Sequence, residues 1–380
     1  VRWTENRNLQ AILSSMESGQ LDPLDLITNR YELNEFEKVY KNLDSSSSIA
    51  TIINYPKKES TKLNRTIILN KREDKFKQKE GVIGLIGSGN YTRSVILPSL
   101  VNSQAIIKYI ASANGVSGTN YAKKYNIQKS TTDYKDILND KSVDTVFITT
   151  RHNLHAKLVI ESLKAGKNIF VEKPLALTLE ELNNIEKNID KYPDINIMVG
   201  FNRRFSKHME LIKKGLGHNP GPINMNLIMN AGFIEPSHWV HDMEVGGGRL
   251  IGEACHLLDL GVYLSGSNIK EICVNSIGKE TNLKTDNASI LLKFENGSNA
   301  VISYFSNGSR KYQKERVEVY SKDRTWISNN YKKTESFYPE GSKILYKKTD
   351  KGQQTQFLRY IESIQGGGHT LIPIHELINV

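Results

Sequence analysis

The chain has 380 residues, 38% of them hydrophobic and 24% charged, and a net charge of +10. The length predicts two or three domains, and the composition excludes intrinsic disorder and collagen-like repeats. No apolar run approaches the roughly 18 residues of a membrane span and no signal peptide is recognisable, so we expect no membrane contact. The lysines are scattered, which favours a small phosphorylated or nucleotide-linked partner over nucleic acid. Two cysteines, Cys255 and Cys273, are too few for a disulfide framework and suit the cytoplasm.

The first 56 residues do not have the pattern of a complete domain. Periodic apolar residues predict short amphipathic helices over residues 8–18 and 35–43, but two such helices cannot close a core. The segments 1–8 and 18–31 resemble the C-terminal tail of medium-chain, zinc-type alcohol dehydrogenases. The resemblance implies that residues 1–56 are the remnant of a preceding alcohol-dehydrogenase-like domain. It also implies that the chain is the C-terminal part of a fused, two-enzyme polypeptide.

Residues 57–80 are charged and poorly periodic, which predicts an inter-domain linker. The alternative is a surface helix with a long charged face. From residue 81 to 201, short apolar runs alternate with amphipathic segments, and this order predicts a doubly wound parallel sheet of the dinucleotide-binding (Rossmann) type. Strands are predicted at 82–86, 106–111, 143–150, 168–172 and 196–200, and helices at 90–100, 120–125, 134–139, 155–165 and 179–191.

The remainder, residues 202–380, shows longer strand patterns separated by turns such as Asn296-Gly297 and Asn307-Gly308. This predicts a second domain of the α+β type with a mainly antiparallel sheet. Its strands are predicted at 223–229, 269–277, 288–294, 300–305, 315–320 and 324–328.

A glycine turn, Gly87-Ser-Gly89, follows the first buried strand and precedes a helix. Gly87 permits the tight turn, and Gly89 lets the backbone approach a pyrophosphate at the helix N-terminus. Asn90 and Tyr91 belong to the same predicted cofactor contact. The third glycine position of the usual pattern holds Thr92, which weakens the expected helix–strand packing but not phosphate binding.

The carboxylate that usually holds the adenosine ribose of NAD, about 20 residues beyond the glycines, is missing. No Asp or Glu occurs between Tyr91 and Thr132, and the second strand is followed by Ser112 and Asn114. We expect these two side chains to contact the ribose. Since neither a carboxylate nor a suitable Arg is present, NAD and NADP both stay open as cofactors.

Two further motifs complete a family pattern. One is Glu172-Lys173-Pro174 at the end of a strand, and the other is the stretch 246–259, Gly-Gly-Gly-Arg-Leu-Ile-Gly-Glu-Ala-Cys-His-Leu-Leu-Asp. Together with the glycine turn and the stretch 200–205, Gly-Phe-Asn-Arg-Arg-Phe, they resemble the glucose–fructose oxidoreductase, inositol dehydrogenase and MocA family over residues 81–380. The resemblance implies a nucleotide-binding domain followed by an open-faced sheet domain, through whose sheet we expect homo-oligomers. It also implies redox chemistry on sugars with a nicotinamide cofactor.

Hydride transfer from a carbinol needs a proton acceptor and a positive group near the developing alkoxide. Lys173, at a strand end, and His256, which titrates near neutrality, are the candidates. Many members of the family carry Asp four residues before this histidine, where the chain has Gly252. Glu253 and Asp259, three residues to either side of His256, would lie beside the imidazole on a helix. Either could fix its tautomer.

The remaining predicted site residues follow strand ends or precede the glycine run. On the cofactor side we expect Thr150, His152, Glu172 and Lys173, and on the substrate side Asn202, Arg203, His238, Trp239 and His241. The two histidines of the 236–242 stretch, with Cys255 and His256, could also be read as a metal cluster, but a third partner is missing and we expect no metal.

The leading hypothesis is a cytoplasmic NAD(P)-dependent oxidoreductase of a sugar or nucleotide sugar. A redox-assisted glycosidase with tightly bound NAD is the alternative among enzymes. A regulatory protein that senses nucleotides without turnover is the alternative of another class. The presence of both Lys173 and His256 favours the enzymes.

Overall fold

The computed structural model describes residues 3–41, 48–55, 64–70, 81–103, 105–218, 220–278, 284–367 and 370–380. They fall into two compact units, Val1–Asn64 and Arg65–Val380, which are described separately. The predicted linker at 57–80 lies outside the described residues except for 64–70. In the described part of the chain, no helix has the length and apolar character needed to cross a membrane.

The first unit contains the two predicted helices and two strands that the sequence did not predict. Helix α1 (Glu5–Glu17) begins at Thr4, whose hydroxyl accepts a hydrogen bond from the Arg7 N–H, and α2 (Phe36–Lys41) lies between β1 (Ile27–Glu32) and β2 (Ala50–Asn54) in the sequence. The two strands pair in parallel. No described residue of this unit is buried, so these residues form no core by themselves.

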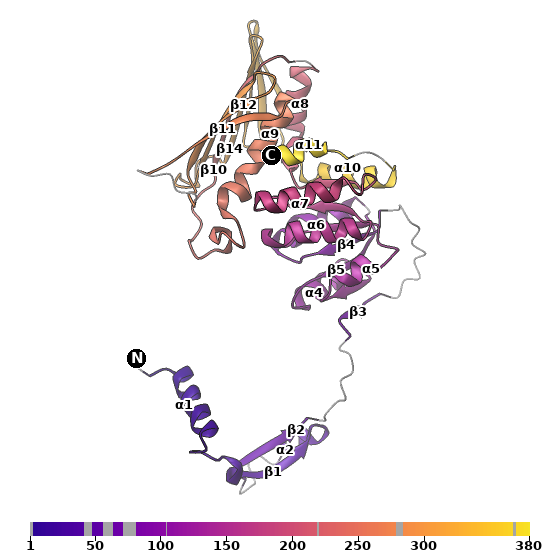
Figure 1. Ribbon diagram of the computed structural model, residues 1–380, viewed down its shortest axis with the longest axis vertical. Helices are drawn as coiled ribbons and strands as arrows, with labels where there is room; N and C mark the ends of the chain where they lie inside the picture. The colour runs from indigo at the N-terminus through magenta and orange to yellow at the C-terminus, as the bar shows by residue number, and fades with distance from the viewer. Residues whose placement is uncertain are drawn as a thin grey trace. The chain divides into compact units, whose positions relative to one another are not determined.

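The second unit opens with a seven-stranded sheet that confirms the predicted doubly wound domain (Figure 1). The strands run in the order β3-β6-β5-β4-β7-β8-β9, and every pair is parallel except β3 with β6. The short strand β3 lies inside the range predicted as a linker. The strands are β3 (Thr66–Ile68), β4 (Ile83–Ile86), β5 (Ile107–Ala111), β6 (Lys129–Thr131), β7 (Thr145–Ile148), β8 (Asn168–Val171) and β9 (Ile197–Val199).

Helices cover both faces of this sheet, and its central strands β4 and β7 are therefore buried along their whole length. The rings of Phe147 and Phe170 stack in the core at 4.8 Å between centroids. The helices of this part are α3 (Leu97–Asn102), α4 (Val116–Lys124), α5 (Lys135–Asn139), α6 (His155–Lys164) and α7 (Leu179–Ile189).

An eight-stranded sheet follows, in the order β11-β12-β13-β10-β14-β15-β16-β17. Only β10 and β13 pair in parallel, so the sheet is mainly antiparallel, as predicted. Buried and exposed residues alternate along its inner strands because α8 and α9 cover one face. The elements are α8 (Lys207–Leu216), α9 (Cys255–Ser265), β10 (Asn224–Asn230), β11 (Ile269–Ser276), β12 (Ala288–Phe294), β13 (Asn299–Phe305), β14 (Glu315–Ser321), β15 (Arg324–Asn329), β16 (Lys333–Tyr338) and β17 (Gly341–Tyr346).

The chain then returns to the first sheet through α10 (Gln353–Gln365) and α11 (Ile374–Asn379). Phe357 and Tyr360 of α10 are fully buried in the core that contains Phe147 and Phe170. The predicted range 202–380 therefore includes a helix whose side chains complete the core of the nucleotide-binding domain.

Candidate active site

The glycine turn after β4 has the geometry of a phosphate cradle. Gly87 has a φ of +114°, which disfavours a side chain, and a Cβ there would meet the Thr149 carbonyl oxygen at 2.6 Å. At Gly89 a Cβ would meet nothing within 4 Å, so the space beside the turn is open. Helical backbone starts at Asn90, which is exposed beside this space. The residues present thus fit the pyrophosphate of a dinucleotide.

Thr92, at the third glycine position, holds the helix against the sheet in another way. Its side chain is buried, and its hydroxyl donates to Thr149 Oγ1 at 2.9 Å. Its neighbour Tyr91 is partly exposed, and burial of its hydroxyl, together with the charge of Glu172, raises its pKa. The expected loss of helix–strand packing is therefore offset by a side-chain hydrogen bond.

The two predicted ribose contacts after β5 have different surroundings. Ser112 is buried, and its hydroxyl accepts a hydrogen bond from the Gly118 N–H at 3.2 Å. Asn114 is exposed at the same strand end. Ser112 therefore organises the turn into α4, and Asn114 is the one of the two that is exposed.

Two histidines follow β7 and Thr150. His155 is fully buried, with Nδ1 2.7 Å from the Pro174 carbonyl oxygen and Nε2 3.3 Å from that of Thr150. Burial lowers its pKa to about 4, so the ring is neutral and carries a single N–H. The shorter contact, from Nδ1 to the Pro174 carbonyl oxygen, is the hydrogen bond that this N–H can donate. His152 donates from Nδ1 to the Gly246 carbonyl oxygen at 2.8 Å. This leaves Nε2 of the neutral ring as an acceptor.

Glu172 and Lys173 lie at the end of β8. Burial raises the pKa of Glu172 to about 7 against the opposing charge of Lys173. A Cβ at Gly200 would lie only 2.9 Å from Glu172 Oε1, so this glycine leaves the room that the carboxyl group occupies. The ammonium of Lys173 donates to the Gly252 carbonyl oxygen at 2.5 Å. The lysine is thereby aimed at the segment that contains His256.

A pocket of about 320 Å³ brings most of the predicted reaction centre together. Its walls come from the ends of β7 and β8, from the loop before α9 and from the sheet domain. They contain seven of the predicted site residues and several that were not predicted. The lining residues are His152, Lys173, Arg203, Met229, Ile234, His238, Trp239, Val240, Gly252, Glu253, His256 and Lys314.

His256 is 7% exposed, and its Nδ1 has no hydrogen-bond partner among the described residues. Burial lowers its pKa well below the usual value, and Arg203, Lys173 and Lys314 add to this effect. The imidazole is therefore neutral at physiological pH.

The two carboxylates expected beside His256 are both bound to arginines. Glu253 accepts a hydrogen bond from Arg249 Nε at 3.0 Å. Burial alone would raise the pKa of Glu253, but the hydrogen bond and charge of Arg249 outweigh burial, so that the pKa is lowered. Asp259 is 1% exposed and accepts from Arg204 at 2.5 and 3.2 Å. Burial raises the pKa of Asp259 to about 6 despite that charge. Glu253 lines the pocket, whereas Asp259 does not.

Two adjacent predicted substrate residues hold the nucleotide-binding and sheet domains together. Arg203 Nε donates to Glu315 Oε2 at 2.6 Å, and Lys351 donates to the other oxygen of Glu315 at 2.6 Å. Asn202 donates to the Lys351 carbonyl oxygen at 2.6 Å and does not line the pocket. Lys314, which the sequence analysis missed, precedes β14 and lines the pocket.

The loop before the glycine run forms an aromatic wall. The Trp239 ring meets His152 edge-on at 4.9 Å, and the Arg151 guanidinium lies 5.6 Å from its centroid. A Cβ at Gly246 would lie 2.6 Å from backbone atoms of Val240, which explains why the close approach of this loop needs glycine.

His238 lines the pocket, whereas His241 faces Asp286 with Nδ1 3.6 Å from its carboxylate. In the described residues no group of three or more His, Cys, Asp or Glu side chains is placed to hold a metal ion.

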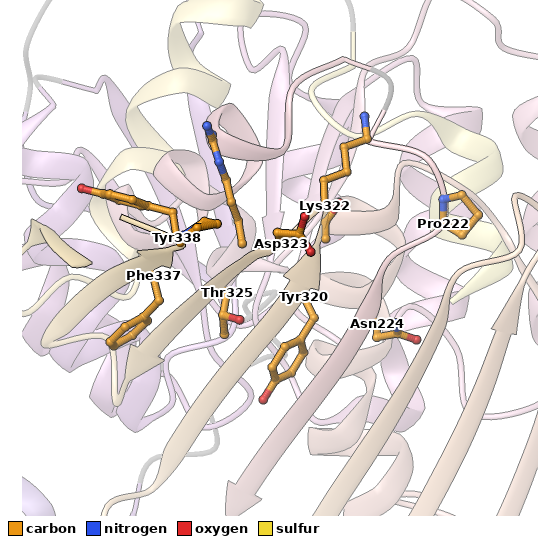
Figure 2. Close-up of a pocket in the computed structure, with 11 residues that line it drawn as sticks. Pro222, Asn224, Tyr320, Lys322, Asp323, Thr325, Phe337 and Tyr338 are labelled. Carbon is orange, nitrogen blue, oxygen red and sulfur yellow. The ribbon is translucent and has the colours of Figure 1, made fainter. Parts of the chain in front are cut away.

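A second hollow, of about 560 Å³, lies over the turn between β14 and β15 (Figure 2). Figure 2 shows Tyr320 of β14 and Phe337 of β16 with Thr325 of the intervening β15 between them, and Lys322 and Asp323 at the turn. None of the predicted site residues lines it. Of these two pockets, only the smaller one is lined by predicted site residues.

Comparisons with known proteins identify the family of both domains of the second unit. A family model described as an oxidoreductase family with an NAD-binding Rossmann fold (GFO_IDH_MocA) matches residues 82–201. A second model, the GFO/IDH/MocA C-terminal domain, matches residues 222–326. Together the two models cover more than half of the chain.

The sequence identities to three individual proteins are below 30%. An uncharacterized oxidoreductase of Bacillus subtilis (YrbE) is 29% identical over 262 residues, which are 67% of this chain and 76% of the relative. Myo-inositol 2-dehydrogenase of Thermotoga maritima is 28% identical over 237 residues, 59% of this chain and 69% of the relative. The solved structure of levoglucosan dehydrogenase in complex with NADH and levoglucosan matches with a TM-score of 0.68 at 20% identity, over 78% of this chain and 93% of that one. This last likeness concerns the fold.

Proposed function

Because the chain belongs to the GFO/IDH/MocA oxidoreductase family, we propose that it is an NAD(P)-dependent dehydrogenase or reductase of a sugar, sugar derivative or nucleotide sugar. The observation that carries the proposal is the pocket lined by both Lys173 and His256. Relatives named for inositol and levoglucosan support a polyhydroxylated substrate.

The cofactor would lie along the carboxyl ends of β4, β5 and β7. Gly87 and Gly89 would hold its pyrophosphate, and Asn114, on the turn that Ser112 organises, would contact the ribose. Bound NAD would supply the hydride acceptor for the oxidised carbon. The aromatic wall formed by His152 and Trp239 would lie beside that carbon and shield it from water.

The two reaction-centre residues would divide the proton chemistry. Neutral His256 is able to accept the hydroxyl proton of the carbinol, and the Lys173 ammonium is able to donate a hydrogen bond to the same oxygen as it becomes a carbonyl. In the reverse direction the imidazolium returns that proton. The Gly252 carbonyl, which accepts from Lys173, orients the ammonium.

The test is absorbance at the reduced-nicotinamide band, with purified chain, NAD or NADP and a panel of sugars. We expect Lys173→Ala and His256→Ala each to lower turnover by at least roughly a hundredfold, the scale of a lost proton-transfer group. NADH affinity should survive in both. His375→Ala, on the exposed side of α11, is the matched control. Near-normal turnover in either active-site variant would remove that residue from the mechanism.

We also propose that the open face of the second sheet joins copies of the chain. Exposed apolar side chains gather on it across neighbouring strands, and an apolar sheet face of this kind marks an interface. Light scattering of the purified chain tests this, and a monomer at micromolar concentration would reject it. The residues that carry the argument are Leu291, Val301, Tyr320, Phe337 and Ile344.

The domain boundaries remain part of the proposal: a nucleotide-binding domain at 81–201, completed by α10, and a substrate domain at 202–380. Residues 1–56 would pack against an alcohol-dehydrogenase-like domain. Support for this comes from their exposed apolar side chains, such as Leu9 and Leu13 of α1, which are 61% and 64% exposed.

A further inference from the structure

The charges around the pocket point to a substrate that is itself negatively charged. We propose that the pocket binds a sugar bearing an anionic group, a carboxylate or a phosphate, and that Lys314 is the residue that holds this group. The inference rests on the proposed function and narrows its substrate class.

Cations outnumber acids in the pocket wall. Three cationic side chains, Lys173, Arg203 and Lys314, line it together with a single carboxylate, that of Glu253. This carboxylate is already bound by Arg249, which lies outside the lining. Glu253 by itself therefore does not balance the charges of the three lining cations.

The next acid outward is also fully engaged. Both oxygens of Glu315 accept hydrogen bonds, one from Arg203 and one from Lys351, each at 2.6 Å. The single negative charge of Glu315 is thus shared between the positive side chains of Arg203 and Lys351. Lys173 donates to a backbone carbonyl, which carries no net charge.

Lys314 is the cation for which the described residues offer no acceptor. Within the described residues its ammonium forms no hydrogen bond or ion pair, and Lys314 is exposed and lines the pocket. Partial burial and the nearby charges of Arg203 and Lys351 lower its pKa, although Glu253 and Glu315 oppose this. An anion in the pocket would relieve that repulsion.

The excess of positive charge also affects the pKa of His256, the proposed proton acceptor. Four cations, Arg203, Lys173, Lys314 and Lys351, act with burial to lower the pKa of His256. Since an opposite charge nearby favours the protonated ring, a bound anion would raise the pKa of His256 toward the range where it accepts a proton readily. The substrate would therefore help to activate its own base.

The anion belongs to the substrate rather than to the cofactor. The glycine turn that would hold the cofactor's phosphates contributes no residue to this pocket. The Glu172 carboxyl, next to Lys173, is partly neutral at pH 7 because burial raises its pKa to about 7, so it does not replace the missing charge.

Calorimetry on the NADH-saturated protein tests the proposal. The probes are D-glucose, D-glucuronate and D-glucose 6-phosphate, so that a carboxylate and a phosphate are compared with the neutral sugar. We expect at least one anionic probe to bind about tenfold or more tightly than glucose, the ratio given by one charge-assisted hydrogen bond. We expect Lys314→Met to remove the preference and Lys314→Arg to keep it. Lys311→Met, three residues away and outside the pocket, should change nothing.

Equal binding of all three probes, or an unchanged preference in Lys314→Met, would overturn the inference. The acid limb of kcat/KM gives a second readout: Lys314→Met should move it to higher pH, because one charge that lowers the pKa of His256 is lost. Failure of the proposed function would look different. In that case the chain would not bind NADH, or would oxidise no sugar at all, whereas turnover of neutral sugars without preference would reject only the charge argument.

Discussion

At the scale of single residues, the most informative position is Gly252. The family resemblance leads one to expect Asp there, and Glu253 or Asp259 is the expected substitute. The structure instead packs the His152 ring against this glycine, since a Cβ at Gly252 would lie 3.0 Å from His152 Cε1. The backbone carbonyl of Gly252 also accepts a hydrogen bond from the Lys173 ammonium. A missing side chain thus makes room for an imidazole in the pocket wall.

We therefore expect Gly252→Ala to lower kcat/KM by about tenfold or more, because the new methyl group would push His152 or the Lys173 acceptor out of place, and small misplacements are costly in an active site. Steady-state kinetics with the best substrate of the panel measures it. The double variant Gly252→Ala with His152→Ala restores the space, and a loss no larger than that of His152→Ala alone would locate the effect in this contact. An unimpaired Gly252→Ala enzyme would contradict the close packing.

At the scale of elements, apolar patterning predicted the strands that are buried on both faces, and it failed where burial is polar or the element is short. Strands β4, β7 and β8 are continuous apolar runs, because helices cover both of their faces. The three-residue β6 has no such run. Strand β16 buries Thr334 and Ser336 on its inner side, which gives no hydrophobic alternation.

The site follows the same division. The glycine turn, Lys173 and His256 were found because each belongs to a local motif after a strand or before a helix. Lys314 and Glu315 were not, because isolated charged residues carry no periodic signal and their neighbours come from distant segments. The spacing of apolar residues in α10 was a signal that could have been used.

One prediction belongs to the turn between β4 and the helix after it. Gly89→Asp should lower NADH affinity about tenfold or more, because it places a negative charge beside the pyrophosphate. A Cβ at this position meets nothing within 4 Å, so the fold should be unaffected. Calorimetry measures the affinity, and Gly89→Ala, which adds bulk without charge, is the control. Equal NADH affinity in the parent and Gly89→Asp would show that the cofactor binds elsewhere.

At the scale of the whole molecule, the two units differ in how they are held together. The second unit has two extensive buried cores, whereas no described residue of Val1–Asn64 is buried. We expect deletion of residues 1–56 to leave NADH affinity and the melting temperature of the remaining chain nearly unchanged. Hydrogen exchange on the intact chain should show weak protection in 3–41. Strong protection there, lost together with that of 81–200, would indicate one cooperative domain and contradict the prediction.

The return of α10 to the first sheet also sets the order in which the protein becomes complete during synthesis. Phe357 packs 6.1 Å from Phe147 and 5.2 Å from Phe170, yet the entire eight-stranded sheet is translated between these partners. While the ribosome is still making that sheet, the nucleotide-binding domain lacks the part of its hydrophobic core that α10 supplies. A nascent chain therefore finishes its cofactor-binding half only after its substrate-binding half has been made.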